Sequence, residues 1–94
     1  MKKPIVFHYT TTANVPYTFN FGVGCSAFQI KNFSSDQVQL SYGDEIDLNS
    51  YILIAPKTAE IIYAEAVATV DSETDKVTVQ SVGASEIEIR LLEF

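Results

Sequence analysis

Tryptophan is missing from this 94-residue sequence, and cysteine and histidine occur once each. A single cysteine, Cys25, cannot form an internal disulfide, and nothing near it supplies the clustered His or Cys that zinc needs. No Lys, Arg or His lies within five residues of Cys25 to lower its pKa. We therefore expect Cys25 to be a buried small hydrophobic residue rather than a reactive thiol.

Basic residues are scarce, with six Lys and Arg against twelve Asp and Glu, which gives a net charge of −6. Such a charge repels phosphate and anionic lipid, and it removes the attraction on which nucleic-acid binding depends. The adjacent basic pair Lys2 and Lys3 is interpreted as solvated. We expect no nucleic-acid partner.

Long hydrophobic runs are also lacking. The run from Pro4 to Phe7 is cut short by His8, so it is too brief for the hydrophobic region of a signal peptide. No stretch approaches the roughly 20 apolar residues of a membrane span. We expect no membrane partner and a protein that is made in the cytoplasm.

Apolar residues nevertheless make up 47% of the chain, which is enough for a folded core. A length of 94 residues fits one domain, residues 1–94. Apolar and polar residues alternate with the period of two that is typical of strands with one buried face. The alternation is clearest in Phe28, Ile30; Val38, Leu40, Tyr42; Val77, Val79; and Ile87, Ile89, Leu91.

These patterns predict strands at residues 5–10, 17–23, 27–32, 37–42, 51–55, 59–69, 76–82 and 86–93. The segments 32–36, 71–75 and 82–85 have turn chemistry, so we expect each to join antiparallel neighbours. Residues 59–70 are rich in Ala and Glu, so a helix is an alternative for this segment, but the alternation of Ile61, Tyr63 and Val67 favours a strand. The predicted fold is all-β, a single antiparallel β-sandwich or jelly-roll-like small barrel of about eight short strands.

Candidate sites are few. His8 lies in a Phe-His-Tyr stretch of the first strand and no G-x-S-x-G nucleophile motif is present, so we interpret it as a strand-face histidine. Residues 43–50 carry Glu45, Asp47 and Asn49 at alternate positions, as in a calcium loop, but Pro56 stands where the terminal glutamate belongs. The acidic cluster of Asp71, Glu73 and Asp75 is interpreted as a solvated turn. We expect no enzyme, and no catalytic, cofactor-binding or metal-binding residue.

Three further features have structural interpretations. Gly22-Val23-Gly24 lacks the rest of a dinucleotide motif and indicates a bulge or a close backbone approach. Asn32-Phe33-Ser34 matches the glycosylation triplet, which has little weight without a secretory signal. Aromatic residues concentrate in the N-terminal third, where we expect most to fill the core and a minority to form a subunit contact; they are Phe7, Tyr9, Tyr17, Phe19, Phe21 and Phe28.

Residues 28–40, which read FQIKNFSSDQVQL, resemble a recurring element of small tailed-bacteriophage virion proteins, in which a strand ending I-K-N-x-S is followed by a turn and a short strand. Residues 51–56 and 61–64 are similar to the next part of that pattern, and residues 86–94 resemble its closing strand. Lys57-Thr58 departs from it, because that family commonly has Gly-Glu there. The resemblance spans roughly residues 27–94.

The resemblance implies a β-sandwich virion subunit, such as a capsid decoration or cement protein, whose partner is the major capsid protein or another virion protein. It also implies a homo-oligomer located in the virion and carries over no functional residue. The alternative is a receptor- or carbohydrate-binding module of a tail or fibre, which would use Tyr17, Tyr42, Tyr51 or loop carboxylates as contacts.

Overall fold

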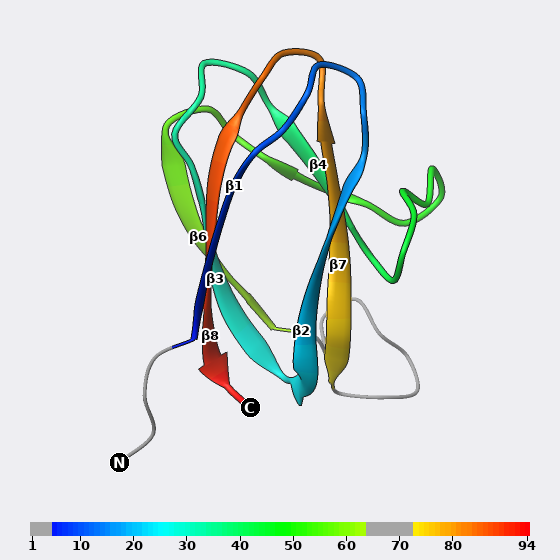
Figure 1. Ribbon diagram of the computed structural model, residues 1–94, viewed down its shortest axis with the longest axis vertical. Coiled ribbons are helices and arrows are strands. Elements are labelled where there is room, and N and C mark those ends of the chain that lie inside the picture. The colour runs from blue at the N-terminus through cyan, green and yellow to red at the C-terminus, as the bar shows by residue number, and fades with distance from the viewer. Residues whose placement is uncertain (1–4, 64–72) are drawn as a thin grey trace.

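A computed structural model describes residues 5–63 and 73–94, and these residues form eight strands and no helix (Figure 1). The strand bounds lie within two residues of those predicted, except that 64–69 of the predicted strand 59–69 fall outside the described residues. The strands are β1 (Val6–Thr10), β2 (Tyr17–Cys25), β3 (Ala27–Asn32), β4 (Val38–Tyr42), β5 (Ile52–Ile54), β6 (Thr58–Tyr63), β7 (Thr74–Ser81) and β8 (Glu86–Glu93).

The strands build two antiparallel four-stranded sheets packed together, as the sequence predicted. The first sheet has the order β1-β8-β3-β6 and the second sheet the order β2-β7-β4-β5. β4 pairs with β5, β3 with β6, β2 with β7 and β1 with β8, as in one long hairpin with the loop between β4 and β5 at its tip. This long hairpin is rolled up, so that β8 also pairs with β3 and β7 also pairs with β4. This is the strand order of an eight-stranded jelly roll.

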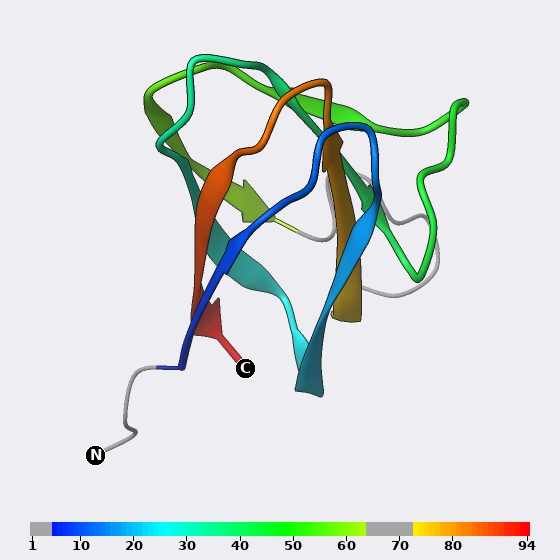
Figure 2. The ribbon, with the colours of Figure 1, turned by 45° about the horizontal axis from the view of Figure 1, so that its top comes forward.

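The predicted hairpin turns are wrong. Residues 32–36 lead from the first sheet to the second, and residues 82–85 lead from the second back to the first. The segment 71–75 is also expected to join antiparallel neighbours, but β6 and β7 belong to different sheets. Residues 71 and 72 fall outside the described part of the chain, and Thr74 and Asp75 already lie in β7. Figure 2 shows connections arching between the sheets at one end of the sandwich. The antiparallel neighbours β4 and β5 are joined instead by the longer loop 43–51.

The ambiguous segment 59–70 is a strand as far as it is described, because β6 runs to Tyr63. The helix alternative is therefore wrong for residues 59–63, and residues 64–70 fall outside the described part of the chain. The alternation of Ile61 and Tyr63 is present, but these side chains face outward and are half exposed, whereas Ile62 between them is buried. A period of two alone does not tell which face of a strand is buried.

One hydrophobic core fills the space between the sheets. Phe28 and Leu40 at its centre are fully buried. The residues in which the alternation is clearest, from β3, β4, β7 and β8, all pack there, since Tyr42 lies against the cluster and the others belong to it. A buried set of hydroxyls, Thr11, Ser81 and Ser85, ties the connections together at the end of the sandwich, with Ser81 Oγ 2.8 Å from Ser85 Oγ.

Within the two described stretches of chain, no helix has the length and hydropathy needed to span a membrane.

Candidate functional site

His8 lies on the outer face of β1, where its Nε2 is 3.1 Å from Glu88 Oε1. Lys31 approaches the other carboxylate oxygen of Glu88, with Nζ 3.4 Å from Oε2. Strand register places all three residues in one row across β1, β8 and β3. His8 is thus a strand-face histidine, as predicted, within a polar row in which Glu88 and Lys31 carry opposite charges.

Cys25 is fully buried at the end of β2, and its Sγ lies 3.0 Å from the carbonyl oxygen of Ala27. Removal from water raises the pKa of the thiol above its usual value of 9.0. Burial and a raised pKa both oppose thiolate formation, so the expectation of a buried hydrophobic residue is confirmed.

The loop 43–51, considered above for calcium, folds over one half of the outer face of the second sheet. Three hydroxyl groups on that face hold it: Thr78 Oγ1 donates to Gly43 O at 2.9 Å, Ser41 Oγ to Ser50 O at 3.1 Å, and Thr18 Oγ1 to Asp44 O at 3.4 Å. These bonds explain why Ser41 and Thr78 are buried although they face away from the core. Among the residues that the structure describes, no three His, Cys, Asp or Glu side chains gather as a metal site.

The other acidic cluster is only partly described. Asp71 falls outside the described residues, and both Glu73 and Asp75 are exposed. Glu73 lies over Gly24, where an added Cβ would be 3.2 Å from its Oε1. Gly22 has a φ of +73° at the point where the pairing of β2 with β7 shifts register, so the prediction of a bulge is confirmed.

Asn32 of the glycosylation triplet is buried and forms a structural link. Its Nδ2 donates to Asp36 O at 2.8 Å, to Ala55 O at 3.2 Å and to Ile54 O at 3.3 Å. Its Oδ1 accepts from Ser34 N at 3.0 Å and from Ser34 Oγ at 2.7 Å. The side chain joins the connection after β3 to the connection after β5 and is not accessible for glycosylation in the folded chain.

The aromatic residues of the N-terminal third mostly fill the core, as expected. Tyr9 and Tyr17 stack with ring centroids 3.5 Å apart, which places them where edge strands β1 and β2 meet. Of the three tyrosines suggested as sugar contacts, Tyr17 packs against the core, and Tyr42 is held there with its Oη donating to Tyr63 O at 3.4 Å. Burial raises the pKa of Tyr42 to about 12. Tyr51, by contrast, is 42% exposed.

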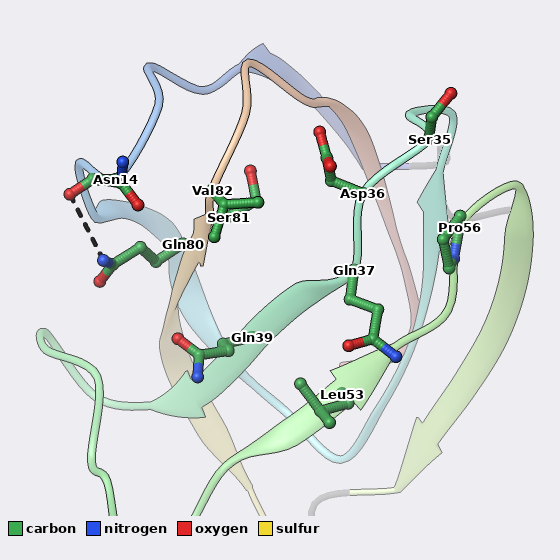
Figure 3. A pocket seen from close by; sticks show the side chains of 10 residues that line it. All are labelled: Asn14, Ser35, Asp36, Gln37, Gln39, Leu53, Pro56, Gln80, Ser81 and Val82. Carbon is green, nitrogen blue, oxygen red and sulfur yellow. Dashed lines mark hydrogen bonds between the residues drawn. The ribbon is translucent and has the colours of Figure 1, made fainter.

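A polar groove occupies the uncovered half of the outer face of the second sheet (Figure 3). Its volume is about 390 Å³. Register places Gln39 of β4 opposite Gln80 of β7 on one side and opposite Leu53 of β5 on the other, so these three side chains form one row. The remaining lining residues are Ser81 at the end of β7 and six residues from the connections at this end of the sandwich: Asn14, Ser35, Asp36, Gln37, Pro56 and Val82.

Several polar groups in this groove have free hydrogen-bonding capacity. Gln80 Nε2 donates to the main-chain oxygen of Asn14 at 3.3 Å, a bond drawn in Figure 3, and its Oε1 accepts no bond from the described residues. The side-chain amides of Gln37 and Gln39 and the carboxylate of Asp36 have no hydrogen-bond partner within residues 5–63 and 73–94. Lysine, arginine and histidine do not occur among the ten lining residues.

This groove cannot be recognised from the sequence. The alternation of apolar and polar residues places Gln39 and Gln80 on the solvent side of their strands, which is correct, and Gln37 lies just before β4. Their meeting depends on pairing between β4 and β7, whose register partners Gln39 and Gln80 lie far apart in the chain. The only local signal is the recurrence of glutamine at alternate positions 37 and 39.

A second, smaller hollow of about 310 Å³ lies at the end of β3 and β6, where its lining includes Phe33, Lys57 and Ala59. Beside it runs β6, an edge strand whose outer face carries Ile61 and Tyr63, 50% and 49% exposed. Among the four sheet edges of the described chain, β5 has three residues and β2 is bulged, whereas β1 and β6 keep regular register.

Comparison of the chain with models of protein families, with curated proteins and with solved structures gives no significant match.

Proposed function

We propose that this protein is a non-enzymatic structural subunit of a virus particle, a capsid decoration or cement protein or another small virion component. It acts through protein-protein contacts with the major capsid protein or another virion protein and forms a homo-oligomer. It is made in the host cytoplasm and resides in the virion, where its acidic surface suits an exterior position away from packaged nucleic acid.

The observation that carries this proposal is the edge strand β6. Six residues keep regular antiparallel register with β3 and present an edge that can pair with a strand of another chain. Half-exposed Ile61 and Tyr63 lie beside that edge on the outer face, and aromatic residues of this kind are enriched at the centres of interfaces. Jelly rolls occur in viral capsid proteins and also in lectins, so the fold is compatible with the proposal and does not select it.

The test replaces Ile61 with Glu and measures two properties, the molar mass in solution by light scattering and co-sedimentation with capsids that lack the protein. We expect the parent chain to oligomerise and to bind such capsids, and we expect Ile61→Glu to weaken both. Leu48→Glu is the matched control, because Leu48 is exposed on the loop that covers the other sheet. A parent chain that stays monomeric and leaves capsids unbound would contradict the proposal.

The second candidate is the receptor- or carbohydrate-binding module of a tail or fibre. The groove on the second sheet favours it, because a hollow with several free hydrogen-bonding groups is suited to a polar ligand. Tyr17 and Tyr42 do not support it, since both pack against the core.

A further inference from the structure

Hydrogen-bonding chemistry limits what the groove on the second sheet can bind. Each glutamine amide offers two donor hydrogens and an acceptor oxygen, and Asp36 adds a carboxylate that only accepts. A sugar hydroxyl both donates and accepts, so it can satisfy either end of an amide and can donate to the carboxylate. An apolar ligand would leave these groups desolvated and without partners, which is costly.

The charge of the groove lining further restricts the class of ligand. The lining contains a carboxylate and no cationic side chain, so phosphate, sulfate or a sugar acid would find no counter-charge. The net charge of −6 acts in the same direction at long range. The ligand that suits the groove is therefore uncharged.

The shape of the row also fits an extended ligand. Gln80, Gln39 and Leu53 lie on three neighbouring strands, so the row spans about 10 Å, which is the length scale of a disaccharide. Leu53, which is 47% exposed, and Pro56 supply an aliphatic surface against which the C–H face of a sugar ring can pack. The groove combines polar groups with a small apolar surface, as saccharide sites require.

From these observations we propose that the groove binds a neutral saccharide, with Gln37, Gln39, Gln80 and Asp36 as hydrogen-bonding residues and Leu53 as the packing surface. The proposal rests on the second candidate function and names its ligand class and residues. It does not depend on the interface at β6, which lies in the other sheet.

The experiment titrates ¹⁵N-labelled protein with neutral probes, the methyl glycosides of glucose, galactose, mannose and N-acetylglucosamine and the disaccharides maltose and lactose, and follows the side-chain amide signals. At least one probe should shift the signals of Gln37, Gln39 and Gln80 in a saturable manner. Removal of two hydrogen-bonding side chains in Gln39→Ala/Gln80→Ala should weaken that binding about tenfold or more. Gln29→Ala is the matched control, because Gln29 stands on the first sheet, opposite Ile61 and Arg90.

Four results would overturn the saccharide assignment: no saturable shift with any neutral probe, shifts centred on other residues, equal weakening by Gln29→Ala, or binding of glucuronic acid alone. Binding of a peptide library in this groove without any sugar would retain a binding module and reject the saccharide. Thermal melts of each variant show whether the fold is intact, and Gln37→Ala, at an exposed position in the connection, serves if the double variant is unstable.

Discussion

Replacement of Asn32 by alanine tests the link between the connections after β3 and β5. The side chain is buried and contacts three carbonyl oxygens and both donors of Ser34. Because Nδ2 carries two hydrogens, at most two of those carbonyls are well bonded at once, and the side chain makes about four effective hydrogen bonds.

At about 1 kcal/mol of net stability for each bond, Asn32→Ala should lower the free energy of unfolding by about 3–4 kcal/mol. For a chain of this size such a loss lowers the melting temperature by about 15–20 °C. The measurement is urea unfolding followed by circular dichroism, with a thermal melt beside it. Asn20→Ala is the matched control, because Asn20 accepts one exposed bond from Gly22 N at 3.1 Å and should cost less than about 1 kcal/mol.

Asn32→Asp sharpens the same test. An ionised carboxylate at this position would still accept from Ser34 but would face the three carbonyl oxygens with no hydrogen to donate, so burial raises its pKa in the folded state. A raised folded-state pKa gives stability that is present below the unfolded value, about 3.9, and is lost as the pH rises through the folded value. The Asn32→Asp variant should therefore lie closer to the parent at acidic pH than at neutral pH. Equal losses in Asn32→Ala and Asn20→Ala would refute the reasoning.

Three other substitutions have definite expected outcomes. Phe28→Ala removes a fully buried ring and should cost about 3–5 kcal/mol in urea unfolding; a loss below about 2 kcal/mol would mean that the core is not packed as described. Burial raises the pKa of Tyr42 to about 12. The stability that this provides is present below the unfolded pKa of about 10 and is lost as the pH rises through the folded value. Tyr42→Phe should consequently reduce the alkaline loss of unfolding free energy by about 1–2 kcal/mol, which is less than the full pKa shift corresponds to because solvent reaches part of the ring; equal pH profiles of the variant and the parent would count against the burial of Tyr42. Gly22→Ala forces a side chain to a φ of +73° and should cost about 1 kcal/mol, whereas Gly24→Ala meets only the flexible end of Glu73 and should cost less, and a reversed order in thermal melts would reject the bulge geometry.

The sequence predicts the strands well because apolar and polar residues alternate within each strand, and this pattern can be recognised from neighbouring residues alone. Val38 and Leu40, or Ile87 and Ile89, place their side chains in the core as the period of two indicates. The path of each connection, by contrast, cannot be predicted from neighbouring residues. Residues 82–85 have the composition of a tight turn, yet β7 and β8 lie in different sheets, since pairing between β1 and β8 and between β2 and β7 decides where the chain goes.

The same limit applies to the groove. The polarity of Gln39 and Gln80 predicts that both face away from the core, which is correct. It does not reveal that Ser41 and Thr78, on the same outer face, are covered by the loop 43–51 while the two glutamines stay open. Hydrogen bonds from side chains to the main chain of the loop decide which residues of the outer face are covered. These bonds join segments that are distant in sequence, so the period of two does not predict them.

The rolled-hairpin order also governs how the chain reaches its structure. Only β4 and β5 pair as neighbours in sequence among the described strands, whereas Val6 of β1 must find Arg90 of β8 across nearly the whole chain. Closing such distant loops before contacts form makes folding of all-β domains slow, on the order of milliseconds to seconds. Pairing should then start beside the loop 43–51 and spread outward, with β1 joining last. Lengthening that loop should slow folding, whereas weakening β1 should chiefly accelerate unfolding.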